Sequence, residues 1–238
     1  MRLDIVSLFP AICASALSES IIGRAISKGL VEINCIDLRD FTHDPRRTVD
    51  DTPYGGGAGM VLRPEPLFEC LASLASEESH VVLMTPQGSP FTQKTAARLA
   101  QKKHLVLVCG HYEGVDERAR QCLMNEEISL GDYVLTNGAI AANVVADAVI
   151  RLIPGVLGSA ESPEEESFAK GDLLEYPQYT KPENFQGLRV PAVLLSGNHQ
   201  AIAAWREEQR FIRSIARRPD LLHKHFDYRE IGEENEHN

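Results

Sequence analysis

Two kinds of segment alternate along the chain: short runs of apolar residues, and longer stretches in which apolar residues recur at helical spacing. The short runs predict β-strands at 3–9, 31–37, 80–85, 104–109 and 128–135. The longer stretches predict helices at 18–29, 65–76, 92–103, 139–153 and 199–218. Thr92 is the expected N-cap of the helix that follows it. Because strands and helices alternate, we expect an α/β fold, a mostly parallel sheet with helices on both faces.

The pattern changes after Gly158, where Ser, Pro, Glu, Lys and Gly follow one another with little periodicity. We therefore expect a first domain over residues 1–158 and a flexible interdomain linker over 159–175. A helical domain with an acidic tail should occupy residues 176–238. Its main helix carries an apolar stripe beside several arginines.

The composition is that of a soluble globular protein, with 43% hydrophobic and 24% charged residues. No apolar run approaches the ~20 residues of a membrane helix, and the start MRLDIVSLFP is unlike a signal peptide. Five scattered cysteines without a CxxC pair argue against a disulfide framework and against a zinc site. We expect a cytoplasmic protein without a membrane partner.

The net charge of −10 argues against a general nucleic-acid binder, because neutralising phosphates normally requires a basic surface. Basic residues nevertheless gather between residues 205 and 224, whereas acidic residues crowd 161–166 and the tail. A locally basic face therefore remains open, and RNA is not excluded as a partner.

Glycine-rich or polar segments interrupt the pattern at 53–60, 85–91, 109–118 and 129–142. Three of them follow or overlap a predicted strand, and the carboxyl ends of parallel strands form the ligand crevice of open sheets. Neither a G-x-G-x-x-G after the first strand nor a phosphate-binding G-x-x-x-x-G-K-[ST] is present. Glycine turns beside tyrosine and leucine fit a flat, weakly anionic group such as adenosine. Plain turn chemistry is the alternative for each segment taken singly.

Several longer motifs stand in register over residues 1 to about 220: DIVSLFP, SIIGRA, PYGGGAGM, CGHYEGVDER, SLGDYVLTNG, IPGVLG, YPQYTKP and LLSGNH. With these motifs the chain resembles the bacterial tRNA (guanine-N1)-methyltransferases, the TrmD type of the SPOUT superfamily. The resemblance implies a SPOUT-type sheet with a C-terminal trefoil knot, followed by a small all-α domain. It also implies methyl transfer from S-adenosylmethionine to N1 of the guanosine that follows the anticodon (tRNA position 37).

The resemblance places the methyl donor in a bent conformation between the loops at 85–91, 109–114 and 129–141. The donor-binding residues implied by similarity are Pro86, Gln87, Gly88, Gly110, Tyr112, Gly114, Leu130, Gly131, Asp132, Tyr133, Val134, Leu135 and Gly138. One departure from the family pattern falls here, because this chain has Asn137-Gly138-Ala139-Ile140-Ala141 where relatives usually have Gly-Gly-Glu-Leu-Pro.

Methylation at N1 requires a base for the N1 proton and a partner for the charge that develops on O6. The family uses an aspartate before SF as the base and an arginine before IPGVLG as the partner. Here these positions are Glu166 and Arg151, so the base carries one more methylene than in the family. Glu164, Glu165 and Asp172 are close enough in sequence to compete for the same role.

On the RNA side, the resemblance implies that Asp50 reads a neighbouring guanine, that Glu113 faces the target base and that Arg46 contacts phosphate. The partner is the tRNA anticodon stem-loop, whose single-stranded loop exposes base edges. Relatives are homodimers with the active site at the subunit interface, and the family implies Mg²⁺, for which these residues show no ligand set. A SPOUT enzyme acting on another RNA and a noncatalytic RNA-binding relative are the two alternatives.

Overall fold

A computed structural model describes residues 1–74, 76–158, 166–169 and 173–222. The chain divides into two compact units, Met1–Gly158 (unit 1) and Ser159–Asn238 (unit 2). Among all the described residues, no helix combines the length and the apolar character needed to cross a bilayer.

Unit 1 is an α/β structure around a single parallel sheet of five strands. The strands are β1 (Arg2–Ser7), β2 (Glu32–Asp37), β5 (Ser79–Pro90), β6 (His104–Cys109) and β7 (Glu126–Ser129). They lie in the order β2-β1-β6-β5-β7, and every neighbouring pair is parallel. The prediction of an α/β fold with a mostly parallel sheet is therefore confirmed.

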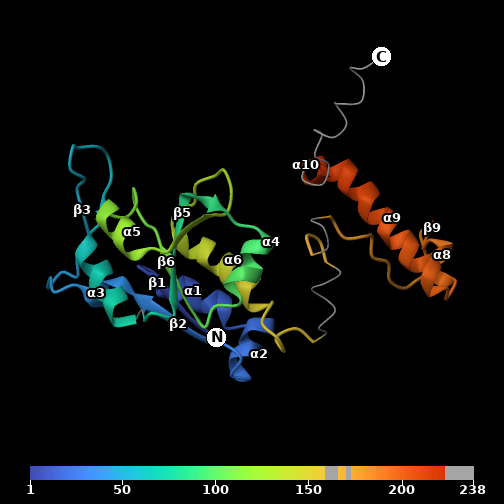
Figure 1. Cartoon of the computed structure of the whole chain (residues 1–238), viewed down its shortest axis with the longest axis horizontal. Coiled ribbons are helices and arrows are strands. Elements are labelled where there is room, and N and C mark those ends of the chain that lie inside the picture. Colours follow the sequence, from blue (N-terminus) through green and yellow to red (C-terminus); the bar gives the residue numbers. More distant parts are fainter. Residues whose placement is uncertain (75, 159–165, 170–172, 223–238) are drawn as a thin grey trace, which may run out of the picture. The chain divides into compact units, whose positions relative to one another are not determined.

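Helices cover both faces of this sheet, because alternate residues of each strand point to opposite sides. On β6, Leu105 and Leu107 pack into one core, whereas Val106 and Val108 pack into the other. The first core includes residues of α1 (Pro10–Leu17), α2 (Ser20–Ser27), α4 (Gln93–Leu99) and α6 (Gly138–Ile150). The second includes residues of the 3-10 helix η1 (Leu38–Phe41), α3 (Pro64–Leu74) and α5 (Glu117–Leu123). Figure 1 shows the two groups of helices on opposite sides of the strands.

Two helices of unit 1, α1 and α5, lie where no helix was predicted. Helix α1 begins with Pro10 at its first turn, a position where the missing N–H of proline is harmless. Its sequence PAICASAL is apolar or small on all sides, so no amphipathic pattern marks it. Thr92, by contrast, caps α4 as predicted, since its Oγ1 accepts a hydrogen bond from the Thr95 N–H at 3.3 Å.

Strand β5 is interrupted by a bulge that no sequence pattern indicated. Its pairing with β7 runs from Val82 to Met84, stops, and resumes at Ser89 and Pro90. The four residues between, Thr85 to Gly88, leave the ladder and form a loop at the carboxyl end of the sheet. The predicted strand 128–135 was too long, because β7 ends at Ser129 and Gly131 adopts a φ of +153°.

A two-stranded ribbon of β3 (Asp50–Asp51) and β4 (Val61–Leu62) flanks the glycine-rich segment 53–60. The N–H of Leu62 donates to the Gly114 oxygen at 2.9 Å, and the Asp116 N–H donates to the Leu62 oxygen at the same distance. The ribbon is thereby tied to the loop that follows β6.

The described part of unit 2 contains α8 (Ala192–Leu195), α9 (His199–Arg217) and α10 (Pro219–Leu222). It also contains a hairpin of β8 (Asn184–Phe185) and β9 (Leu188–Arg189), so the prediction of an all-α domain was wrong in this detail. The hairpin forms because its two turn residues, Gln186 and Gly187, have positive φ angles of 53° and 86°, the geometry of a tight two-residue turn.

Candidate active site

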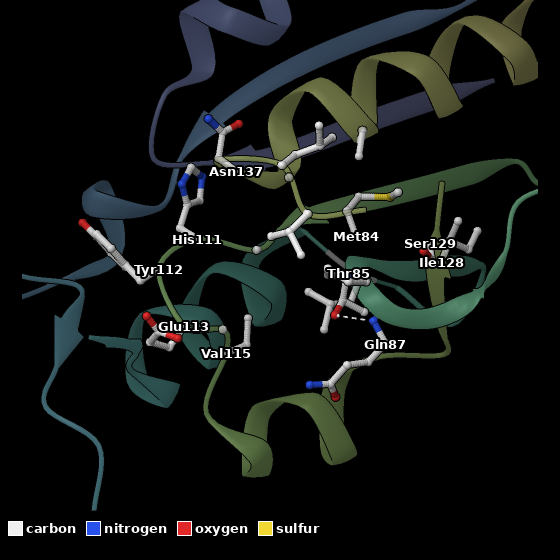
Figure 2. A pocket seen from close by; sticks show the side chains of 18 of the residues that line it. Met84, Thr85, Gln87, His111, Tyr112, Glu113, Val115, Ile128, Ser129 and Asn137 are labelled. Carbon is white, nitrogen blue, oxygen red and sulfur yellow. Dashed lines mark hydrogen bonds between the residues drawn. The ribbon is translucent and has the colours of Figure 1, made fainter. Parts of the chain in front are cut away.

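A pocket of about 340 Å³ lies at the β5 bulge and at the carboxyl ends of β6 and β7. Its volume is within the usual range for small-ligand sites. Three segments contribute most of its wall: the β5 bulge, the loop after β6, and the stretch from β7 into α6. Because these strands are neighbours in the sheet, their carboxyl ends bring the three segments together. Figure 2 shows Tyr112 and Glu113 from the second segment and Gln87 from the first on opposite sides of the pocket.

Most of the predicted donor-binding residues line this pocket: Pro86, Gln87, Gly110, Tyr112, Gly114, Leu130, Tyr133, Val134, Leu135 and Gly138. Three others do not line it. Gly88 lies against the backbone of β7, and a Cβ on Gly131 would meet the Tyr133 ring at 2.8 Å. Asp132 is exposed and lies between Gly131 and Tyr133 in the loop after β7.

Gly138 and Gly110 show how tightly the segments approach one another. The N–H of Gly138 donates to the Gly110 oxygen at 2.8 Å. A Cβ on Gly138 would lie 2.7 Å from the Gly110 nitrogen and 2.9 Å from the Cα of Cys109. Only glycine at 138 permits this approach, which joins the first turn of α6 to the end of β6.

Tyr112 marks the sharp bend after β6. Its φ of +57° is uncommon for a residue with a side chain, and Gly114 follows at +135°. Strained backbone of this kind concentrates at ligand sites, where the surrounding structure holds it in place. The bend turns the backbone of the loop into the pocket wall.

Glu113 connects the pocket to the glycine-rich segment 53–60. Its N–H donates to the Met60 oxygen at 3.0 Å, and a Cβ on Gly59 would meet its carboxylate at 2.5 Å. Glu113 lines the pocket, whereas the segment 53–60 itself does not. The glycines therefore bring a second loop against the carboxylate at the edge of the pocket.

His111 is a buried histidine in the pocket wall, with 5% of its surface exposed. Its Nε2 lies 3.4 Å from the Oγ of Ser7, at the carboxyl end of β1. Burial, and secondarily the charge of Arg39, lower the pKa of His111 to about 4. The ring is therefore neutral near pH 7.

The sequence reasoning missed a pair of charged residues in the pocket wall, Glu117 and Arg120. The Arg120 Nε donates to the Glu117 carboxylate at 2.6 Å, and its Nη1 donates to Glu127 at 2.6 Å. Both pocket residues lie on α5, one of the two unpredicted helices. The motif CGHYEGVDER includes Glu117 and ends two residues before Arg120, so only a prediction of α5 could have placed Arg120 here.

Asp50, Arg46 and Arg151, the other predicted site residues of unit 1, are not part of the pocket lining. Asp50 is half-buried on β3, and Arg46 is exposed in a turn where its N–H donates to the Asp44 carboxylate at 3.0 Å. Arg151 is half-buried at the C-cap of α6. Glu166 lies in unit 2, while Glu164, Glu165 and Asp172 fall outside the described residues.

With this geometry established, comparison with known proteins decides the family. Residues 1–224 match the family described as tRNA (Guanine-1)-methyltransferase TrmD. The chain belongs to this family. The match covers nearly the whole chain, so the resemblance inferred from the motifs is confirmed.

Relatives named tRNA (guanine-N(1)-)-methyltransferase share about half of the residues of this TrmD-family chain. The protein of Geobacillus kaustophilus strain HTA426 is 54% identical over 224 residues, which cover 93% of this chain and 91% of that protein. That of Pelotomaculum thermopropionicum is 56% identical over 226 residues, covering 93% and 90%. That of Dictyoglomus turgidum is 54% identical over 224 residues, covering 94% and 91%.

TrmD-family membership implies S-adenosylmethionine as the methyl donor, and the lining residues fit such a molecule. Apolar side chains, among them Leu130 and Leu135, can cover a flat ring, while Glu113 supplies negative charge for a cationic centre. The described residues give no comparable support for a Mg²⁺ site. Among the described residues, no three His, Cys, Asp or Glu side chains form a group that could hold a metal ion.

Proposed function

We propose that this chain is a tRNA (guanine-N1)-methyltransferase that uses S-adenosylmethionine and acts on the guanosine 3′ of the anticodon. The observation that carries the proposal is the match of residues 1–224 to the TrmD family. It is supported by the pocket at three adjacent strand ends, which has the size and lining for the donor. The TrmD family thus accounts for a pocket that no dinucleotide or nucleoside-triphosphate motif explained.

The donor-binding part of the proposal assigns two roles to the pocket. Backbone groups around Gly110 and the stretch from Leu130 to Gly138 hold the adenosine, together with Pro86 and Gln87. The Glu113 carboxylate at the edge of the pocket attracts the positive charge of the donor. Gly88 and Gly131 act indirectly, by allowing the close approaches that shape the wall of the pocket. We also propose that these loops form the trefoil knot of the SPOUT superfamily.

The chemical part of the proposal assigns the proton transfer to Glu166. When bound, the donor supplies an electrophilic methyl group on its sulfonium sulfur. The Glu166 carboxylate takes the N1 proton of guanine as N1 bonds to that methyl carbon, and the carbon–sulfur bond breaks, leaving a neutral thioether. A positioned carboxylate base contributes roughly 10²–10⁴-fold. The Arg151 guanidinium stabilises the negative charge that grows on O6.

The RNA part of the proposal assigns recognition to residues outside the donor pocket. Asp50 accepts hydrogen bonds from a guanine edge, Arg46 neutralises phosphate, and Glu113 faces the target base. The part of unit 2 from about residue 176 onward contacts the anticodon stem-loop. We further propose a cytoplasmic homodimer in which residues of both subunits complete each active site.

The proposed function is tested with labelled donor and two tRNA transcripts that carry G or A at the position after the anticodon. Label should transfer to the G transcript only. Substituting Glu166→Gln should lower turnover roughly 10²–10⁴-fold and leave donor binding, measured by calorimetry, intact. Donor binding without transfer to either transcript would contradict the proposed reaction and leave a different RNA, or a noncatalytic role, as the account.

A further inference from the structure

The turn that carries Glu166 is a folded element of unit 2. The Phe168 N–H donates to the Leu173 oxygen at 2.8 Å, and the Glu175 N–H donates to the Oγ of Ser167 at 2.9 Å. Phe168 adopts a φ of +69°, which is costly for an aromatic residue outside a fixed context. Two hydrogen bonds therefore join residues 166–169 to residues 173–175.

Helix α9 holds this turn through a buried hydroxyl. Ser214 is fully buried, and its Oγ accepts a hydrogen bond from the Leu174 N–H at 2.9 Å. The same hydroxyl donates to the Arg210 oxygen, one helical turn earlier, at 2.8 Å. Serine is a poorer helix former than alanine, and bonding back to the preceding turn slightly destabilises a helix. Alanine would therefore suit α9 better if the helix alone mattered, so the hydroxyl serves the attached turn.

Aromatic stacking provides a second attachment, just after the turn. Tyr176 is 7% exposed, and the guanidinium carbons of Arg206 and Arg210 lie 4.6 and 5.3 Å from its ring centroid. Within the turn itself, the guanidinium carbon of Arg218 lies 5.8 Å from the centroid of the Phe168 ring. Such cation–π contacts are strongest where they are shielded from water, as at Tyr176.

We propose that Ser214 and Tyr176 are positioning residues for methyl transfer, which fasten the Glu166 turn to α9 and fix the direction of its carboxylate. This inference rests on the proposed function, in which Glu166 is the base. A carboxylate on a loose loop would have to be ordered in every catalytic cycle, and misplacing a reacting group by about 1 Å can lower a rate roughly 10²-fold. Attachment to a helix of 19 residues supplies that order in advance.

The first test is Ser214→Ala, which removes the acceptor for the Leu174 N–H. We expect kcat to fall roughly 10- to 100-fold, with an unchanged Kd for the donor. Ser27→Ala is the matched control, because the Ser27 Oγ also donates to a backbone oxygen one helical turn earlier, that of Gly23 at 2.9 Å, and Ser27 lies in unit 1 outside the pocket lining. Ser27→Ala should keep full turnover. Wild-type kcat in a folded Ser214→Ala variant would overturn the proposal.

A double-mutant cycle separates positioning from general destabilisation. If Ser214 acts through Glu166, adding Ser214→Ala to Glu166→Gln should lower the residual rate no further. An equal loss in both backgrounds would overturn the proposal while leaving Glu166 as the base. Full activity of Glu166→Gln alone would remove the base assignment, and the positioning role with it.

Tyr176 keeps the proposal testable if Ser214→Ala fails to fold. Tyr176→Leu removes the ring that both guanidinium groups contact. It should lower kcat in the wild-type background and have no further effect in the Glu166→Gln background. Tyr176→Phe retains the ring, so turnover should recover relative to the leucine variant. Equal kcat values in the two variants would contradict a role for the stacked ring.

Discussion

Single residues decide whether the pocket can form, and Gly138 is the clearest case. A Cβ at this position would collide with backbone atoms of Cys109 and Gly110, which cannot move aside as a side chain could. Gly138→Ala should cost about 1–3 kcal/mol of stability and weaken donor binding. Gly158→Ala is the control, since a Cβ there meets nothing within 4 Å. Urea unfolding and calorimetry measure both effects, and equal stability of the two variants would contradict the close approach.

His111 makes stability depend on pH in a defined range. Its pKa is about 4 in the folded chain, against about 6.5 for an unperturbed histidine. Between these values the unfolded state binds more protons, so stability falls as the pH drops from about 6.5 to about 4, by roughly 3 kcal/mol in total. In His111→Gln this contribution should be absent. Unfolding free energies measured across the range should differ in slope between the two proteins, and identical slopes would rule out a buried neutral ring.

Among the elements, α6 begins inside the pocket wall, so its N-cap serves both the fold and the site. The Asn137 side chain accepts a hydrogen bond from the Ala139 N–H at 3.0 Å. Asn137→Ala should lower stability by about 1 kcal/mol and weaken donor binding. Thr92→Ala removes the cap of α4, outside the pocket, and should lower stability by a similar amount without affecting the donor. Donor affinities that fall equally in both variants would contradict a specific role for α6.

The elements also show how far the sequence predicts this molecule. The apolar runs at β1, β5 and β6 predicted the central strands of the parallel sheet, because strands buried on both faces need little polar alternation. The bulge at residues 85–88 was not predictable, since it depends on β5 pairing with β7 a second time beyond the interruption. Helix α5 was missed because Ala119 is the one buried residue among its seven, so no apolar stripe marks it, and Glu117 and Arg120 were missed as members of the site with it.

The sequence predicted where the site lies, but it did not by itself predict the roles of the catalytic residues. Glycine segments at strand ends indicated a crevice from topology alone, and the structure brings three of them around one pocket. The roles of Glu166 and Arg151 came only from family resemblance. No local sequence pattern distinguishes a catalytic carboxylate from the acidic residues beside it, because its role depends on its position relative to the bound guanine.

At the scale of the whole molecule, the proposed homodimer predicts complementation between defective subunits. A Glu166→Gln chain lacks the base, whereas a Gly138→Ala chain lacks a sound donor pocket. If each active site combines the pocket of one subunit with the base of the other, one site of a mixed dimer is intact. Co-expressed and purified as mixed dimers, the two variants should methylate tRNA faster than either alone. Absence of any recovery would contradict a shared active site.

We propose above all that the β5 bulge and the loops after β6 and β7 enclose the methyl donor, and a crystal structure with S-adenosylmethionine tests this most directly. The account predicts the adenosine between Gln87, Gly110 and Leu135, with the methyl group directed out of the pocket past Glu113. Donor bound elsewhere on the chain, or these three residues far from it, would contradict the account.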